Sequence, residues 1–314
     1  MKTPNLFDGA LKIRHLSLVA ALSSEGSVVA AAASLGITQP AASRALREIE
    51  TLLGVRLYER GAQGLTPTRY GEIFTDYARS VLAQLRQSVR HLAEVDAAER
   101  GEVNIGAYLA GTNLLLPRAI AHLKRTSPGV NIVVREAAPA VSLNELKAGR
   151  IDMIVGRLTA AGGDTVWRVP LYQEDVRITV GRRHPLVGRQ DRIDLDELTR
   201  FPWILPGAQT ALRQELADYF SRRGRALPTD TIEVTSFLTV RQLLVETDMV
   251  AVLPGSIGAG DPRLAVLPHE LEGLGHAIGI TTFSGRQLTP AARTMAGILQ
   301  RIGNPLEPGW DKEN

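Results

Sequence analysis

Residues 27–60 carry the pattern that most restricts how this chain can fold. An alanine-rich run after Ser27 predicts a short helix, and Gly36 behind it supplies the positive φ that a tight helix exit needs. Thr38 is a suitable N-cap for a second helix, in which Pro40 occupies the opening turn, where a missing N–H group does no harm. Two short helices joined by so tight a bend form a helix-turn-helix.

The second predicted helix has one apolar face and one polar face. Apolar residues recur at steps of four and three, which predicts a single buried stripe of Ala42, Leu46, Ile49 and Leu53. The opposite face, beside Pro40, carries four side chains that can hydrogen-bond to bases or phosphates: Gln39, Ser43, Arg44 and Arg47. Because an exposed Arg and Gln face is also a common solvated surface, this helix alone leaves DNA binding open.

The segment that follows favours DNA binding over the solvated-face alternative. Residues 57–60 and 64–69 are two short runs on either side of a Gly-containing loop, and they predict a β-hairpin wing. Four polar or basic residues of this wing are placed to touch backbone phosphates or a minor groove: Arg60, Thr66, Thr68 and Arg69.

Together, the two elements resemble the winged helix-turn-helix of LysR-type transcriptional regulators, and the likeness extends over nearly the whole chain. The residues that fall at the family's spacing are Ala31, Ala32, Leu35, Gln39, Pro40, Ser43, Leu46, Glu50, Leu53, Gly54, Leu57, Glu59, Arg60, Leu65, Thr66 and Gly71. The chain departs from the family at Val28, Ala42 and Tyr58, where Phe, Leu and Phe are more frequent. The motif also resembles the subgroup that includes the galactose-binding-protein regulator.

Composition excludes several other classes of protein. The net charge is only +3, so the chain is not a strongly basic nucleic-acid coat protein. It has no cysteine, and its six histidines are scattered without metal-ligand spacing, so we expect no disulfide, metal or cofactor. No apolar run approaches the roughly 20 residues that span a bilayer, and no signal peptide is recognisable. We therefore expect a cytoplasmic protein without a membrane partner.

Residues 71–100 predict a long helix that links two parts of the chain. Its apolar residues alternate at steps of four and three, the spacing of a coiled-coil seam made by Ala78, Leu82, Leu85, Val89 and Leu92. At 1.5 Å per residue such a helix is roughly 40 Å long. Its stripe is buried either against a second copy of the chain or against the chain's own C-terminal half. We expect the first arrangement, which makes a dimer.

Short β-branched runs alternate with helical stretches after Gly101. The expected strands are 103–106, 130–135, 151–155, 175–181, 203–205, 231–235, 249–253 and 277–282, and the expected helices are 114–125, 143–148, 211–223, 237–246 and 290–302. Alternation of this kind predicts α/β architecture with helices on both faces of a parallel sheet.

The family resemblance implies a domain organisation for this fold. The winged helix-turn-helix is expected at 1–70, the linker helix at 71–100 and a two-lobed, periplasmic-binding-protein-like effector domain at 101–304. Lobe I is expected at 101–169 with 274–302, and lobe II at 170–273. Residues 305–314 have the composition of a disordered tail.

Four loops of the C-terminal half are candidates for a ligand site, because ligands of α/β sheets bind beyond the carboxyl ends of strands, at helix N-termini. The first loop contains Tyr108, Ala110, Gly111 and Thr112, and the second contains Gly156 and Arg157 after the strand 152–155. The third contains Gln209 and Thr210, and the fourth contains Ser236 and Phe237. Backbone N–H groups, hydroxyls, one guanidinium and aromatic rings suit a small polar or anionic effector.

An enzyme and a transport-type solute-binding protein are the two alternatives, because an α/β fold does not decide function. The chain lacks a GxSxG elbow, a phosphate-binding P-loop, an HExxH pair and a cysteine nucleophile. The N-terminal helix-turn-helix is evidence against a transport-type solute-binding protein. We therefore expect a ligand-responsive transcriptional regulator that catalyses nothing. The resemblance further implies a tetramer made of two dimers on an interrupted dyad in double-stranded DNA, and RNA polymerase as a partner.

Overall fold

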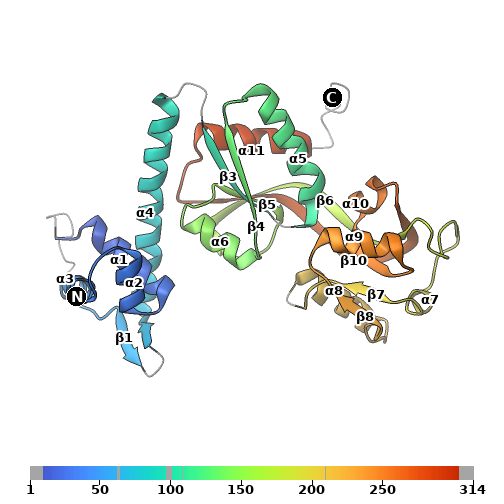
Figure 1. Ribbon diagram of the computed structural model, residues 1–314, viewed down its shortest axis with the longest axis horizontal. Helices are drawn as coiled ribbons and strands as arrows, with labels where there is room; N and C mark the ends of the chain where they lie inside the picture. Colours follow the sequence, from blue (N-terminus) through green and yellow to red (C-terminus); the bar gives the residue numbers. More distant parts are fainter. Residues whose placement is uncertain (1–9, 62–63, 97–100, 108, 209, 304–314) are drawn as a thin grey trace.

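The computed structural model describes residues 10–61, 64–96, 101–107, 109–208 and 210–303, which form three parts (Figure 1). A small part, called the head here, contains the first three helices and a two-stranded sheet. It lies at one end of the long helix α4 (Arg69–Asp96), and a larger α/β part, called the body, contacts the other end. The predicted tail and the predicted effector residues Tyr108 and Gln209 lie outside the described residues.

The head begins with α1 (Ile13–Glu25), which we did not predict, and continues with α2 (Val28–Ser34) and α3 (Gln39–Leu53). The predicted helix-turn-helix of α2 and α3 is confirmed. Ser27 Oγ accepts the Ala30 N–H at 3.1 Å, and Thr38 Oγ1 accepts the Ala41 N–H at 3.4 Å. Each cap satisfies a backbone donor that the first turn of its helix leaves unpaired.

The predicted apolar stripe of α3 is also confirmed. Ala42, Leu46 and Ile49 are buried and Leu53 is partly buried, so this side of α3 forms the floor of the head's core. The stripe packs against apolar residues of α1 and α2, namely Leu18, Val19, Leu22, Ala31 and Ala32. Burial of the stripe leaves the polar face of α3 at the surface.

Strands β1 (Tyr58–Gly61) and β2 (Gly64–Pro67) pair antiparallel and form the predicted wing. A carboxylate fixes the wing to α3, because Glu50 Oε1 accepts the N–H groups of Leu57 at 2.8 Å and of Tyr58 at 3.2 Å. The phenol of Tyr58 is buried and donates to the carbonyl of Val19 in α1 at 3.1 Å. The wing is therefore tied to both neighbouring helices.

The body is built on one mixed sheet of eight strands in the order β4-β3-β5-β10-β6-β9-β7-β8. We call the side of β4, β3 and β5 lobe I and the side of β9, β7 and β8 lobe II. Lobe I contains β3 (Glu102–Ala107), α5 (Leu109–Thr126), β4 (Asn131–Glu136), α6 (Pro139–Lys147), β5 (Met153–Arg157) and α11 (Pro290–Gly303). Lobe II contains α7 (Leu195–Leu198), β7 (Trp203–Leu205), α8 (Ala211–Arg222), β8 (Thr231–Glu233), α9 (Phe237–Glu246), β9 (Val250–Pro254) and α10 (Gly255–Gly260).

Two long strands, β6 (Val166–Gly181) and β10 (Leu264–Phe283), run antiparallel through both lobes. This corrects our prediction of short strands at 175–181 and 277–282. Proline and glycine residues within the strands, such as Pro170, Pro268 and Gly273, interrupt the alternating pattern from which a strand is predicted. The pairing tolerates them through three register shifts, which lie between residues 266 and 279 of β10.

Other boundaries also differ from prediction. Helix α5 begins at Leu109 rather than 114, and α6 begins at Pro139 rather than 143. The pair Gly156 and Arg157, predicted as a loop, belongs to β5, since both residues pair with β10. Small residues at the start of α5 and a glycine in β5 weaken the periodic signals there.

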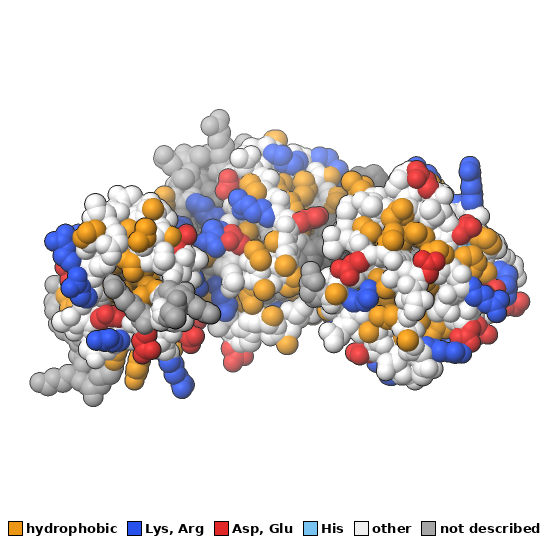
Figure 2. Space-filling view, turned by 60° about the horizontal axis from the view of Figure 1, so that its bottom comes forward, with side chains coloured by type: hydrophobic (Ala, Val, Ile, Leu, Met, Phe, Trp, Pro, Cys, Tyr) orange, Lys and Arg blue, Asp and Glu red, His pale blue; other side chains and the backbone are white. Residues whose placement is uncertain are grey.

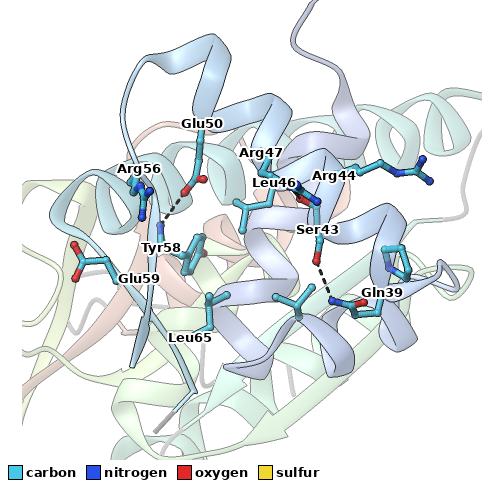
Figure 3. Close-up of a pocket in the computed structure, with 12 residues that line it drawn as sticks. Gln39, Ser43, Arg44, Leu46, Arg47, Glu50, Arg56, Tyr58, Glu59 and Leu65 are labelled. Carbon is cyan, nitrogen blue, oxygen red and sulfur yellow. Dashed lines mark hydrogen bonds between the residues drawn. The ribbon is translucent and has the colours of Figure 1, made fainter. Parts of the chain in front are cut away.

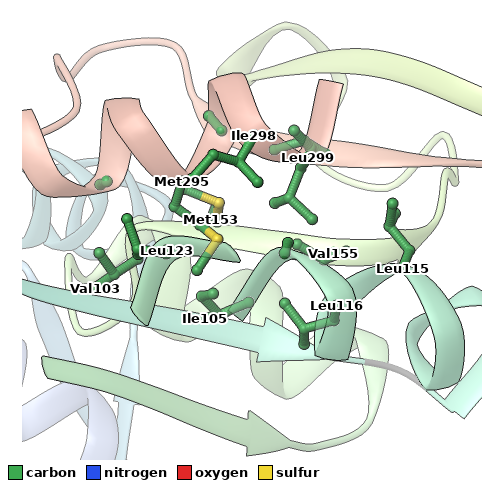
Figure 4. Packing of buried hydrophobic residues seen from close by; sticks show 14 of the residues in the cluster. Val103, Ile105, Leu115, Leu116, Leu123, Met153, Val155, Met295, Ile298 and Leu299 are labelled. Atoms are coloured by element: carbon green, nitrogen blue, oxygen red, sulfur yellow. The ribbon is translucent and has the colours of Figure 1, made fainter. Parts of the chain in front are cut away.

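The sheet separates the helices of lobe I into two layers. Helices α5 and α11 cover one face, where Met153 and Met295 lie among the aliphatic side chains of β3 and α5 (Figure 4). Helix α6 covers the other face, with Leu146 against Ile154. Lobe II has its own cores, one of which contains the fully buried Trp203, whose Nε1 donates to the carbonyl of Leu198 at 3.0 Å.

Helix α4 covers most of the range predicted for the linker, whose residues 97–100 lie outside the described residues. The apolar seam of α4 is divided between two environments. Ala78 and Leu82 are buried against Leu16 of α1. Leu85, Val89 and Leu92, past the end of the head, have exposed fractions of 40%, 67% and 70%. The C-terminal part of the seam is therefore the part that is open to a second chain.

The start of α4 meets the wing so closely that only glycine fits at position 71. A Cβ atom on Gly71 would lie 2.0 Å from the carbonyl oxygen of Leu57. We expect Gly71→Ala to lower the free energy of unfolding of the head by about 1–3 kcal/mol, the usual range for overpacking. Differential scanning calorimetry of the head's transition measures this change.

Gly297→Ala in α11 is the matched control, because a Cβ there meets nothing within 4 Å. Alanine is the better helix former by about 1 kcal/mol, so this variant should keep or raise the stability of the body. Equal effects of the two substitutions would contradict the close approach at Gly71.

Candidate nucleic-acid interface and effector site

A groove of about 1040 Å³ separates the polar face of α3 from the wing (Figure 3). The α3 side contributes Gln39, Pro40, Ser43, Arg44 and Arg47, which are the predicted DNA-contacting residues of that helix. The wing side contributes Arg56 and Glu59. The structure thus places the predicted residues of α3 along one side of a single open groove.

Two hydrogen bonds organise the exposed side chains of α3. Gln39 Nε2 donates to Ser43 Oγ at 3.0 Å, and Arg47 Nε donates to the Ser43 carbonyl at 3.2 Å. The first bond uses one of the two amide N–H groups of Gln39. Arg44 is exposed and extends away from the helix in Figure 3. This face therefore presents an amide, a hydroxyl and guanidinium groups to solvent.

The predicted wing residues are in different situations. Thr66 is exposed and lies opposite Glu59 in the β1–β2 pair, and Arg69 is exposed at the start of α4. The side chain of Arg60 lies outside the described residues. The Thr68 hydroxyl donates to the Arg56 carbonyl at 2.7 Å and accepts the Gly71 N–H at 3.1 Å, so it is already engaged within the head.

Sequence reasoning missed Arg56 as a groove residue. Its side chain is exposed and lines the groove from the wing side. The available signal was a basic residue between the end of α3 and β1. On the face shown in Figure 2, basic and acidic side chains are interspersed, in keeping with the low net charge. Local arrangement rather than overall charge therefore marks the groove.

At the junction of the lobes, Arg157 contacts groups from two other elements. Its guanidinium forms an ion pair with Glu215 of α8, and Nη1 lies 3.0 Å from His276 Nε2 on β10. Glu215 Oε2 also lies 3.1 Å from His276 Nε2. We did not predict Glu215 or His276, because nothing local in the sequence relates them to a residue 58 or more positions away.

The imidazole of His276 cannot serve both neighbours at once. Burial lowers the pKa of His276, Arg157 lowers it further, and Glu215 opposes both effects. A neutral ring that accepts an N–H of Arg157 at Nε2 has no proton there for Glu215. Burial raises the pKa of Glu174, which lies opposite His276 in the β6–β10 pair and accepts the Ser256 hydroxyl at 3.2 Å. The junction is therefore polar and of mixed charge at these residues.

The other predicted effector residues are not gathered around Arg157 by the described contacts. Thr210 Oγ1 caps α8 by accepting the Arg213 N–H at 3.3 Å and donates to the Gly207 carbonyl at 2.7 Å. Ser236 is exposed at the N-cap of α9, and the half-buried Phe237 packs against the core of lobe II.

The remaining predicted group, Ala110, Gly111 and Thr112, belongs to the first turn of α5 rather than to a loop before it. Their side chains lie outside the described residues. The backbone alone therefore places this turn in lobe I, directly after strand β3.

Two further features concern the described part of the chain as a whole. It contains no group of three or more His, Cys, Asp or Glu side chains arranged to hold a metal ion. None of its helices is long and apolar enough to cross a membrane.

The chain matches two family models and resembles known sequences and solved structures. Residues 13–72 match the bacterial regulatory helix-turn-helix protein model of the lysR family, and residues 96–303 match the LysR substrate binding domain. The transcriptional regulator YdcI of Escherichia coli K12, itself described as uncharacterized, is 31% identical over 96% of this chain and 99% of its own length. The regulator GbpR of Rhizobium radiobacter is 31% identical over 76% of this chain and 79% of its own.

Among solved structures, a full-length OxyR variant from Pseudomonas aeruginosa superposes with a TM-score of 0.62 at 23% identity, over 92% of this chain and 97% of that one. That likeness concerns the fold alone. The family models, by contrast, cover both the head and the body, and the relatives YdcI and GbpR are both named as transcriptional regulators. The chain belongs to the LysR family of DNA-binding transcriptional regulators with an effector-binding domain.

Proposed function

We propose that this protein binds a specific interrupted dyad in double-stranded DNA as an oligomer and is switched by a small polar or anionic metabolite bound between lobes I and II. The observation that carries the proposal is the groove between α3 and the wing, which gathers the polar side chains of the recognition helix at the surface. The proposal places the protein in the cytoplasm, with RNA polymerase as a partner when it is bound at a promoter.

In the DNA-bound state, α3 enters the major groove by its N-terminal half. Gln39 and Arg44 read base edges, since an amide pairs bidentately with adenine and a guanidinium with guanine. Ser43, Arg47 and Pro40 border these contacts. Arg56, Arg60, Thr66 and Arg69 approach the phosphates beside the wing, where they fix orientation without reading sequence.

Two heads are held together by pairing of α4 with the α4 of a second chain. The exposed Leu85, Val89 and Leu92 supply the apolar stripe for this contact. A dimer places two recognition helices on one duplex, which explains a dyad operator, and two dimers complete a tetramer.

The effector acts on the contact between lobes. Arg157 brings a positive charge to the junction, and its guanidinium already forms an ion pair with Glu215. An anionic effector must therefore displace this carboxylate, whereas a neutral polar effector hydrogen-bonds beside it. In either case the effector shifts the equilibrium only by its preference for one arrangement of the lobes.

The DNA assignment is tested with duplexes that wild-type protein selects from a random library. Gln39→Ala and Arg44→Ala should each weaken binding to the selected duplex by about 1–3 kcal/mol and weaken binding to random DNA much less. Arg69→Ala, as a phosphate contact, should weaken both by the same factor and lower the salt dependence. Gel-shift titrations at several salt concentrations measure these effects. Unchanged affinity in the two α3 variants would exclude α3 from the groove of DNA.

The dimer assignment is tested by Leu85→Glu, which puts a charge on the exposed seam and should lower the oligomeric state in sedimentation velocity. Arg86 lies off the seam but is unsuitable as a control, because its guanidinium donates to the Ala148 carbonyl. His91→Glu, on an exposed position off the seam, serves instead and should assemble as the wild type does. Assembly of both variants as the wild type would mean that the chains pair elsewhere.

The effector assignment is tested by a thermal-shift screen of sugars, sugar acids and aromatic acids, since a ligand of the native state raises the melting temperature. Glu215→Gln removes the carboxylate that competes for Arg157, so it should tighten binding of an anionic hit about tenfold or more, while Arg157→Gln abolishes it. A neutral hit should respond weakly to Glu215→Gln. If no compound in the screen stabilises the wild type, sensing by a metabolite of these classes is rejected.

A further inference from the structure

The C-terminal half of α4 is fastened to lobe I by contacts that neither proposed site uses. Arg86 Nη1 donates to the Ala148 carbonyl at 2.8 Å, and Arg90 Nη2 donates to the Gly149 carbonyl at 3.3 Å. Both carbonyls lie just past the end of helix α6, where unpaired carbonyl groups carry the negative end of the helix dipole. Two guanidinium groups of the linker helix therefore cap a helix of the body.

Arg90 also pairs with a buried carboxylate of the body. Arg90 Nη2 lies 3.0 Å from Oδ1 of Asp152, whose exposed fraction is 2%. The other oxygen, Oδ2, accepts the N–H of Asn104 in β3 at 2.8 Å. Burial raises the pKa of Asp152, and the Asn104 N–H, Arg90 and the body's own Arg286 oppose that shift. The linker helix thus supplies one of two positive charges that act on this buried carboxylate, and the one that forms an ion pair with it.

A second set of contacts joins α4 to the loop before α11. Gln84 Nε2 donates to the Gly285 carbonyl at 3.2 Å, and Gln87 donates to the Gln287 carbonyl. In the same loop Arg286 Nη2 donates to the Leu146 carbonyl of α6 at 2.9 Å. The helix is therefore held along two edges, one formed by α6 and the other by this loop.

Between these edges the backbones of α4 and the body approach without a large side chain. Ala83 is completely buried, and a Cβ atom on Gly149 would lie 2.7 Å from the Cβ of Ala83. Gly149 has a φ of 69°, which other residues adopt only with strain. The fit is specific to a small residue on each side.

We propose that these contacts, which we call the linker clamp, make α4 and lobe I one rigid unit, so that lobe II is the part that moves relative to the heads when an effector binds. The clamp consists of Gln84, Arg86, Gln87 and Arg90 on α4 with Gly149, Asp152 and the loop 285–287 on the body. Because Leu85, Val89 and Leu92 remain exposed, the helix holds its own body and a second chain at the same time. The inference rests on the proposed function for the roles of effector and operator.

Spin-label distances test the rigidity directly. The chain contains no cysteine, so labels at Asp76→Cys on α4 and Gln300→Cys on α11 are unique, and both sites are exposed. With labelled protein diluted in unlabelled protein, the clamped molecule should give one narrow distance distribution. The double variant Arg86→Ala/Arg90→Ala should broaden it at least twofold.

Arg79→Ala is the matched control, because its guanidinium contacts Ser23 Oγ of the head at 3.1 Å rather than the body. It should leave the distribution narrow. Ala83→Leu inserts a wedge without changing charge and should broaden the distribution as well, which keeps the test valid if the arginine variant does not fold. Distributions of equal width in the wild type and in every variant that folds would overturn the clamp.

The second readout separates the clamp from the proposed function. When the heads are held less rigidly, the effective concentration of the second head at the second half-site falls. The clamp variants should therefore bind a selected duplex with two half-sites at least fivefold more weakly than the wild type. They should bind a duplex with a single half-site as the wild type does. Broadened distances with unchanged two-half-site affinity would reject the role of the clamp in placing the heads. Wild-type protein that fails to prefer its half-site over random DNA would reject the proposed function and leave the distance result standing.

Discussion

The antiparallel pairing of β6 with β10 is the interaction on which the C-terminal body depends. These strands are shared by both lobes, so their pairing joins lobe I and lobe II in one continuous sheet. The pairing sets His276 opposite Glu174, and Arg157 reaches His276 because β5 pairs with the neighbouring stretch of β10. The polar junction of the lobes is thus a direct product of strand register.

Local features of the sequence predict local structure well. The helix after Ser27, the cap at Thr38, the stripe at Ala42 and Ile49, and the turn at Gly36 are all determined within a few residues, and each is confirmed. The family's spacing then indicates what such a helix is for. The structure places the polar residues of α3 along one groove, and their contacts with DNA stay a prediction.

Contacts between distant residues escape this kind of prediction. The carboxylate of Glu50 accepts backbone N–H groups of the wing, and Arg157 pairs with Glu215 from the other lobe. Neither contact has a periodicity or a motif, because each depends on how separate elements pack. The lengths of β6 and β10 were underestimated for a related reason. Prolines and glycines weaken the strand pattern in each sequence segment, and the pairing with neighbouring strands that continues past them depends on the whole fold. The proposed effector site therefore depends on the structure more heavily than the proposed DNA interface.

The close approach of Gly71 to the Leu57 carbonyl has a mechanical consequence. Together with the hydrogen bonds of Thr68, it makes the first turn of α4 an integral part of the head. Towards its other end the helix is bound to lobe I through Arg86 and Arg90. A helix fixed at both ends transmits rotation, so a rotation of lobe I turns the wing through nearly the same angle. Because α4 is roughly 40 Å long, a small tilt of lobe I also displaces the head by several ångströms.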